Sequence, residues 1–101
     1  TSYARAAYYL ARNLYYAGEL DSVRAYAQRG IARFPERRER SQRDLFWLTQ
    51  LHRIKGMGWY STSRFDSAIV TFQAMYRYAE QAHIPKDMGA ALSYQGFALR
   101  G

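Results

Sequence analysis

The tetrapeptide Leu20-Asp21-Ser22-Val23 has a counterpart 45 residues later, in Phe65-Asp66-Ser67-Ala68. The similarity extends upstream, where Ala11, Leu14 and Tyr15 align with Gly56, Trp59 and Tyr60, and Gly96 with Leu99 begins a third copy. Each tetrapeptide follows a segment whose apolar residues have helical spacing, and it begins a second segment of the same kind. Such self-similarity is typical of helical repeat proteins, which usually bind a partner along a surface. The repeat therefore directs the search for function to a surface.

The composition of this 101-residue chain fits one small domain that is rich in helix. Hydrophobic residues make up 49% of it, which is enough for a core, and alanine and tyrosine outnumber valine and isoleucine. There is no cysteine, so neither a disulfide framework nor a cysteine metal site is available. No apolar run reaches about 18 residues, so we expect no membrane span. The composition does not indicate a cellular compartment.

Helical spacing and turn residues predict five helices, near residues 2–17, 21–34, 38–61, 65–83 and 86–99. Gly18 is expected to follow the first helix, and Pro35 to stop the second because proline cannot continue a helix. Asp21 is expected to cap the second helix, and Ser63 with Asp66 to form a capping box for the fourth. We therefore expect an all-α domain in which consecutive helices are antiparallel.

The segment from Ala7 to Pro35 resembles a tetratricopeptide repeat. The residues that carry the resemblance are Leu10, Ala11, Leu14, Gly18, Glu19, Leu20, Asp21, Val23, Ala27, Gly30 and Pro35. A second unit matches through Gly56, Trp59, Tyr60, Phe65, Asp66, Ala68, Phe72 and Met75. The resemblance implies a TPR-like α–α superhelix of helical hairpins, about two and a half repeats long. Units longer than the usual ~34 residues resemble the irregular repeats of bacterial signalling and regulatory proteins.

The third unit begins with a helix that has no partner helix. Because about three repeats are needed for stability, we expect residues 1–101 to form a single repeat domain that is a fragment of a longer array. The alternatives are that the last helix is a cap, or that two chains self-associate through this C-terminal helix. On that helix the apolar residues expected to be exposed are Ala91, Leu92, Phe97 and Leu99.

The resemblance also implies where a partner binds, because the first helix of each pair lines the concave surface of the family's fold. The corresponding residues here are Arg5, Tyr8, Arg12, Tyr15 and Tyr16, then Arg53, Met57 and Tyr60, then Phe97 and Arg100. Arginine binds carboxylates and phosphates with paired hydrogen bonds, and tyrosine adds rigid apolar area. We expect this face to bind an acidic peptide or helical segment of another protein. For several of the tyrosines, packing between helices is the alternative.

The net charge of +7 also favours an acidic partner. Nucleic acid is the competing hypothesis, because basic and aromatic residues together suit it, but no recognition-helix or RNA-binding sheet motif is present. An enzyme is not expected. His52 and His83 lack the spacing of a helical metal pair, and there is no glycine-rich phosphate loop. No cofactor or metal ion is expected either.

Overall fold

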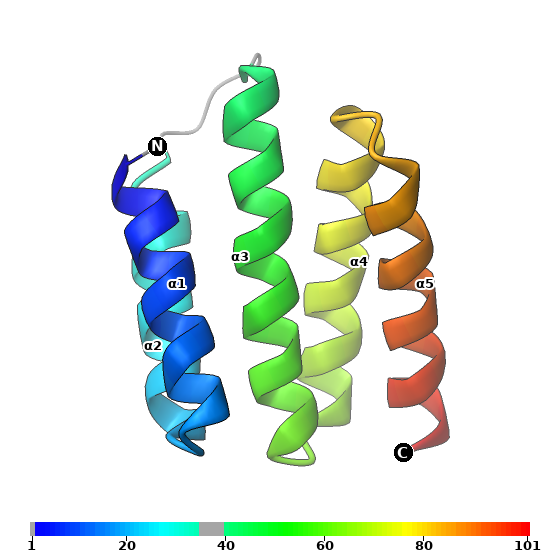
Figure 1. Cartoon of the computed structure of the whole chain (residues 1–101). Coiled ribbons are helices and arrows are strands. Elements are labelled where there is room, and N and C mark those ends of the chain that lie inside the picture. Colours follow the sequence, from blue (N-terminus) through cyan, green and yellow to red (C-terminus); the bar gives the residue numbers. More distant parts are fainter. Residues whose placement is uncertain (1, 35–39) are drawn as a thin grey trace.

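The computed structural model describes residues 2–34 and 40–101, which form five α-helices arranged as successive hairpins (Figure 1). The helices are α1 (Ser2–Tyr16), α2 (Leu20–Ala32), α3 (Gln42–Ser61), α4 (Phe65–Gln81) and α5 (Pro85–Arg100). These residues contain no strand. The expected all-α fold is confirmed.

Helix α3 lies at the centre of the molecule. It contacts α1 and α2 on one side and α4 and α5 on the other. Successive helices run in opposite directions, so α1, α3 and α5 are parallel to one another (Figure 1). Because α3 contacts both α1 and α5, these three helices form a continuous layer. In the described part of the chain, α2 and α4 do not contact each other.

The turns after α1, α3 and α4 share one geometry. Gly18, Ser63 and His83 have positive φ angles of 82°, 61° and 56°. In each turn the next N–H bonds to the carbonyl oxygen five residues earlier: Glu19 to Leu14 (2.9 Å), Arg64 to Trp59 (2.9 Å) and Ile84 to Ala79 (3.0 Å). Together with a second bond from the positive-φ residue itself, this is the Schellman motif. Gly18 and Ser63, which are 45 residues apart, therefore repeat this turn geometry at equivalent positions of the two units.

Two expected helix caps are wrong. Ser63 belongs to the turn that follows α3, so it cannot form a capping box, and the N-cap of α4 is Arg64. Asp21 lies within the first turn of α2, after the N-cap residue Glu19. Its carboxylate is 3.1 Å from the guanidinium of Arg24. In both cases the N-cap residue, Glu19 or Arg64, makes no side-chain capping hydrogen bond.

The connection between α2 and α3 also differs from the expected bounds. Helix α2 ends at Ala32, and α3 begins at Gln42 instead of residue 38. Ser41 is the N-cap of α3, where its hydroxyl oxygen accepts a 3.0 Å hydrogen bond from the N–H of Asp44. Pro35 and the first two residues of the expected third helix lie outside the described residues. The remaining helix ends agree with the expected ones to within two residues.

The core lies between the helices and contains several small residues. Its buried clusters consist of Ala4, Ala7 and Leu51; of Ala11, Val23, Ala27 and Ile54; and of Ala68, Phe72, Met75, Ala91 and Ala98. A Cβ atom added to Gly56 would clash with the ring of Phe72, and one added to Gly30 would lie 2.9 Å from the Cβ of Ala7. Gly56 and the fully buried Ala11, which align in the repeat, both lie where another helix packs closely. The expected exposure of Ala91 is wrong, because α4 residues cover it.

Candidate functional site

The exposed side of α1 carries arginine and tyrosine in alternation. Arg5, Tyr9, Arg12 and Tyr16 recur at intervals of three and four residues, and all four are exposed. The guanidinium of Arg12 lies 6.0 Å from the ring centre of Tyr9 and 5.8 Å from that of Tyr16. At these distances a ring attracts a cation, so the two tyrosines help to hold Arg12 over the helix. We call these four residues the α1 ridge.

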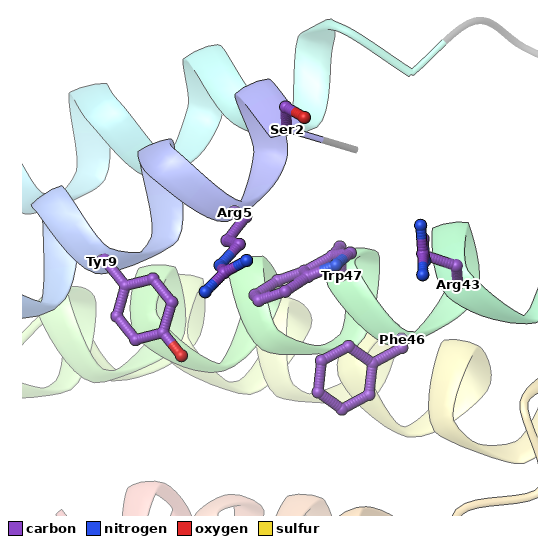
Figure 2. Close-up of a pocket in the computed structure, with 6 residues that line it drawn as sticks. All are labelled: Ser2, Arg5, Tyr9, Arg43, Phe46 and Trp47. Atoms are coloured by element: carbon purple, nitrogen blue, oxygen red, sulfur yellow. The ribbon is translucent and has the colours of Figure 1, made fainter.

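A basic pocket opens where the first turns of α1 and α3 meet. Its volume is about 360 Å³, and its lining consists of Ser2, Arg5, Tyr9, Arg43, Phe46 and Trp47 (Figure 2). The indole of Trp47 packs at 5.0 Å from the ring of Phe46 and 6.3 Å from that of Tyr9. Figure 2 shows Arg5 and Arg43 on opposite sides of this indole. The site, which we call the arginine pocket, combines two cations with a rigid aromatic floor.

The positive charge of this region is not neutralised within the described part of the chain. The ion pairs there join Arg24 to Asp21 and Arg53 to Asp87. Arg5, Arg12 and Arg43 take part in neither. A carboxylate or phosphate group from outside would therefore gain charge-assisted hydrogen bonds without displacing an ion pair among those residues.

A second, apolar pocket lies toward the other end of α1 and α3, where α4 and α5 also line it. It has a volume of about 180 Å³, and its lining consists of Tyr15, Met57, Tyr60, Phe72, Tyr94 and Phe97. Tyr60 and Phe97 are 38% and 48% exposed, so their rings form an accessible rim. The hydroxyl of Tyr15 lies 3.0 Å from the Ser61 hydroxyl and ties α1 to α3. We call this site the apolar pocket.

Arg53, which the sequence places among the partner-binding residues, is engaged inside the protein. Its guanidinium lies 2.6 Å from the carboxylate of Asp87, whose other oxygen accepts a 2.8 Å hydrogen bond from Gln50. The Nε of Arg53 is buried and has no hydrogen-bond partner. Because Asp87 already neutralises this arginine, Arg53 is better placed to position α5 than to bind a partner.

Tyr8 is half-buried and packs against neighbouring side chains. Its ring centre is 5.9 Å from that of Trp47. Burial raises the pKa of Tyr8, while the charges of Arg53 and Arg12 act in the opposite direction. This tyrosine is therefore mainly a packing residue, and Tyr9 is the exposed tyrosine of the same turn.

The structure distributes the sequence-predicted residues over three places. Tyr15, Met57, Tyr60 and Phe97 meet in the apolar pocket, Arg5 lines the arginine pocket, and Arg12 and Tyr16 lie on the α1 ridge. The guanidinium of Arg100 stacks on the ring of Phe97 at 5.0 Å.

Sequence reasoning missed five residues of the arginine pocket and ridge: Ser2, Tyr9, Arg43, Phe46 and Trp47. Trp47 stands in an apolar run with helical spacing and Arg43 at the end of the most charged stretch of the chain, so neither pattern alone indicates a site. A usable signal was present, because Arg43, Phe46 and Trp47 have the same one, four, five spacing as Arg5, Tyr8 and Tyr9. Two helices that begin with the same arrangement of arginine and aromatic residues can form one site if their first turns meet.

Residues 2–34 and 40–101 contain no cluster of side chains suited to a metal ion. His52 is buried, and its Nδ1 donates a 2.8 Å hydrogen bond to the carbonyl oxygen of Leu48. None of the described helices is long and apolar enough to cross a membrane. Comparison with known proteins gives no match: no family model, no curated protein and no solved structure is similar to this chain.

Proposed function

We propose that the chain is a tetratricopeptide-like scaffold that binds an acidic peptide or helical segment of another protein. The binding face is the layer of α1, α3 and α5, and the host is a regulatory or sensory protein. One observation carries the proposal. Arg5, Arg12 and Arg43 alternate with exposed aromatic rings and have no ion pair within the described residues.

The chemistry of this face suits a protein segment. Arginine binds carboxylates through paired hydrogen bonds, and its weak hydration lets it stack on aromatic rings at the same time. Tyr9, Tyr16 and Trp47 supply apolar area that loses little conformational entropy on binding. Such residues are enriched among the hot spots of protein interfaces. Among the described residues, those that line the arginine pocket include no acidic side chain, so their own field there is positive.

The proposal is tested with a fluorescein-labelled synthetic peptide that is rich in glutamate and contains leucine. We expect Arg12→Ala and Arg43→Ala each to weaken its binding by about ten-fold or more, since hot-spot truncations cost about 2 kcal/mol. The matched control is Arg77→Ala, which removes the same charge from an exposed site on α4. Fluorescence anisotropy measures affinity, and circular dichroism checks that helical content is kept.

Two results would contradict the proposal. An equal loss in Arg77→Ala would mean that total charge, and not this face, determines binding. Tighter binding of a single-stranded oligonucleotide, with a steep fall of affinity in salt, would indicate a nucleic-acid-binding domain.

A further inference from the structure

We infer that this face recognises a bipartite segment, in which an acidic group enters the arginine pocket and a large apolar side chain enters the apolar pocket. The inference rests on the proposed function and adds the chemistry and spacing of the partner. It starts from the contrast between the two pockets, which share α1 and α3 and differ in character. One contains Arg5 and Arg43, whereas the described residues that line the other are all uncharged.

The helix geometry sets the distance between the pockets. On α1 the arginine pocket is centred near Arg5 and the apolar pocket touches Tyr15, a separation of ten residues. On α3 the centres lie near residue 45 and between Met57 and Tyr60, about thirteen residues apart. At a rise of 1.5 Å per residue the pockets are about 15–20 Å apart. An extended peptide spans this distance with about five or six residues.

The surface between the pockets favours a continuous segment over two separate ligands. Arg12 lies on the α1 ridge between them, held between the rings of Tyr9 and Tyr16. On α3 the intervening Arg53 is already neutralised by Asp87. A partner peptide that crosses from one pocket to the other therefore passes Arg12 on α1, which has no ion pair within the described part of the chain. On α3 it passes Arg53, whose charge Asp87 neutralises. Charge complementarity thus places the acidic part of the segment at the arginine pocket and along α1.

The apolar pocket is shaped for one side chain. Its volume of about 180 Å³ is half that of the arginine pocket, and Phe72 forms a fully buried wall. Tyr60 and Phe97 stand at its accessible rim. A leucine, methionine or phenylalanine side chain of the partner would replace water against these rings, which is the main source of favourable free energy at such a contact.

The experiment uses three labelled peptides in which a tri-glutamate block is joined to one leucine by glycine-serine linkers of one, eight or thirty residues. A fourth peptide carries the tri-glutamate block alone. A flexible linker of about eight residues has an average length near the distance between the pockets. The effective concentration of the leucine is greatest when linker length matches that distance, and it vanishes when the linker cannot reach.

We expect the peptide with the eight-residue linker to bind about ten-fold more tightly than the peptide with the one-residue linker. The peptide with the thirty-residue linker should bind less tightly than the one with eight residues. The one-residue peptide should bind no better than the glutamate block alone. Phe97→Ala and Tyr60→Ala should each remove the advantage of the eight-residue linker and leave binding of the glutamate block unchanged. Leu99→Ala is the control, because Leu99 is 73% exposed on α5 and lines neither pocket.

The outcomes separate the inference from the function on which it rests. If the glutamate block binds and is sensitive to Arg43→Ala, but leucine and linker length change nothing, the bipartite inference is overturned and the proposed function stands. If none of the four peptides binds, both are overturned. If Leu99→Ala has the same effect as Phe97→Ala, the leucine binds elsewhere on α5 and the assignment of the apolar pocket is wrong.

Discussion

The carboxylate of Asp87, in the first turn of α5, lies 2.6 Å from the guanidinium of Arg53, in the middle of α3. The side chain of Asp87 is 8% exposed and that of Arg53 is 22% exposed, so the pair is largely shielded from water. Gln50 donates to the second carboxylate oxygen. This relationship fixes α5 against α3 and removes one arginine from the cations available to a partner.

Replacing Asp87 by alanine should destabilise the protein by about 2–3 kcal/mol. The substitution leaves Arg53 and Gln50 without their acceptor, and breaking a buried ion pair is costly because one charge stays buried and unpaired. The usual cost is about 3–5 kcal/mol, and the partial exposure of Arg53 lowers the expected value to the bottom of that range or slightly below it. Urea denaturation midpoints measure the change.

Asp66→Ala is the matched control for this prediction. Asp66 also lies in the first turn of a helix, but it is exposed and forms no ion pair within the described residues. Its loss should cost only the helix-dipole contribution, about 0.3–1 kcal/mol. Equal destabilisation by Asp87→Ala and Asp66→Ala would show that the ion pair with Arg53 adds nothing to the helix-dipole contribution of Asp87.

Gly56→Ala should destabilise the protein by about 1–3 kcal/mol, because its new methyl group would overlap the ring of Phe72 in a packed core. Ala11→Leu should act in the same direction, since Ala11 is fully buried between helices. The control is Gly89→Ala on α5, where a Cβ atom would meet nothing within 4 Å. There the higher helix propensity of alanine should stabilise the protein by about 0.5–1 kcal/mol. The opposite signs would appear in thermal or urea denaturation.

Ser63→Gly should stabilise the protein by about 1 kcal/mol. Ser63 has a φ of 61°, a conformation that is strained for a residue with a Cβ atom and free of strain for glycine. Gly18→Ala tests the same turn geometry in reverse and should cost a similar amount. Ser67→Gly is the control inside α4, where glycine should destabilise by about 0.5 kcal/mol. Stabilisation by both serine substitutions would exclude the turn as the cause.

Stability should fall as the pH drops from about 6.5 to about 4 because of His52. Burial lowers the pKa of His52 from 6.5 to about 4, and the nearby charges of Lys55 and Arg77 act in the same direction. Between these values the unfolded chain binds a proton that the folded chain excludes, so the stability present above pH 6.5 is lost progressively below it, by up to about 3 kcal/mol.

The His52 contribution is isolated by comparing pH profiles of variants. His52→Gln should flatten the dependence between pH 6.5 and 4 relative to the unsubstituted protein. His83→Asn should leave that dependence unchanged, since His83 is exposed and asparagine tolerates its positive φ of 56°. Urea midpoints at each pH give the comparison, and parallel profiles for all three proteins would contradict the assignment.

Self-association through α5 should become visible at high protein concentration. Leu92 and Leu99 are 56% and 73% exposed on this helix. Gly96 aligns with Gly56 in the repeat, yet a Cβ atom there would meet only the end of the Arg100 side chain at 3.8 Å, instead of a packed ring. Leu92→Ser with Leu99→Ser should reduce the association seen by sedimentation or light scattering, whereas Val70→Ser on α4 should not. A protein that stays monomeric at all concentrations would refute this prediction.

The sequence by itself determined the all-α class and the helix order, because these depend on local spacing and on turn residues. Ala68, Phe72 and Met75 recur at intervals of four and three residues, the spacing of one helix face, and all three are fully buried in the structure. Gly18 marked the end of α1 because glycine adopts a positive φ without strain. Ser63 was misassigned as a cap because serine suits both helix starts and turns. Only the chain geometry on both sides of it distinguishes the two.

Tertiary structure decided which side chains meet. Tyr8 and Tyr9 each lie three or four residues from both Arg5 and Arg12, so local spacing does not distinguish them. Only the position of α3 makes Tyr8 half-buried and leaves Tyr9 exposed. Likewise, nothing local pairs Arg53 with Asp87, because 34 residues separate them and their approach depends on how α5 packs against α3. The arginine pocket exists because parallel packing of α1 and α3 brings Arg5 and Arg43 to either side of Trp47. Local spacing fixes each helix face, whereas the packing of the helices decides which faces meet, and that packing minimises the free energy of the whole chain.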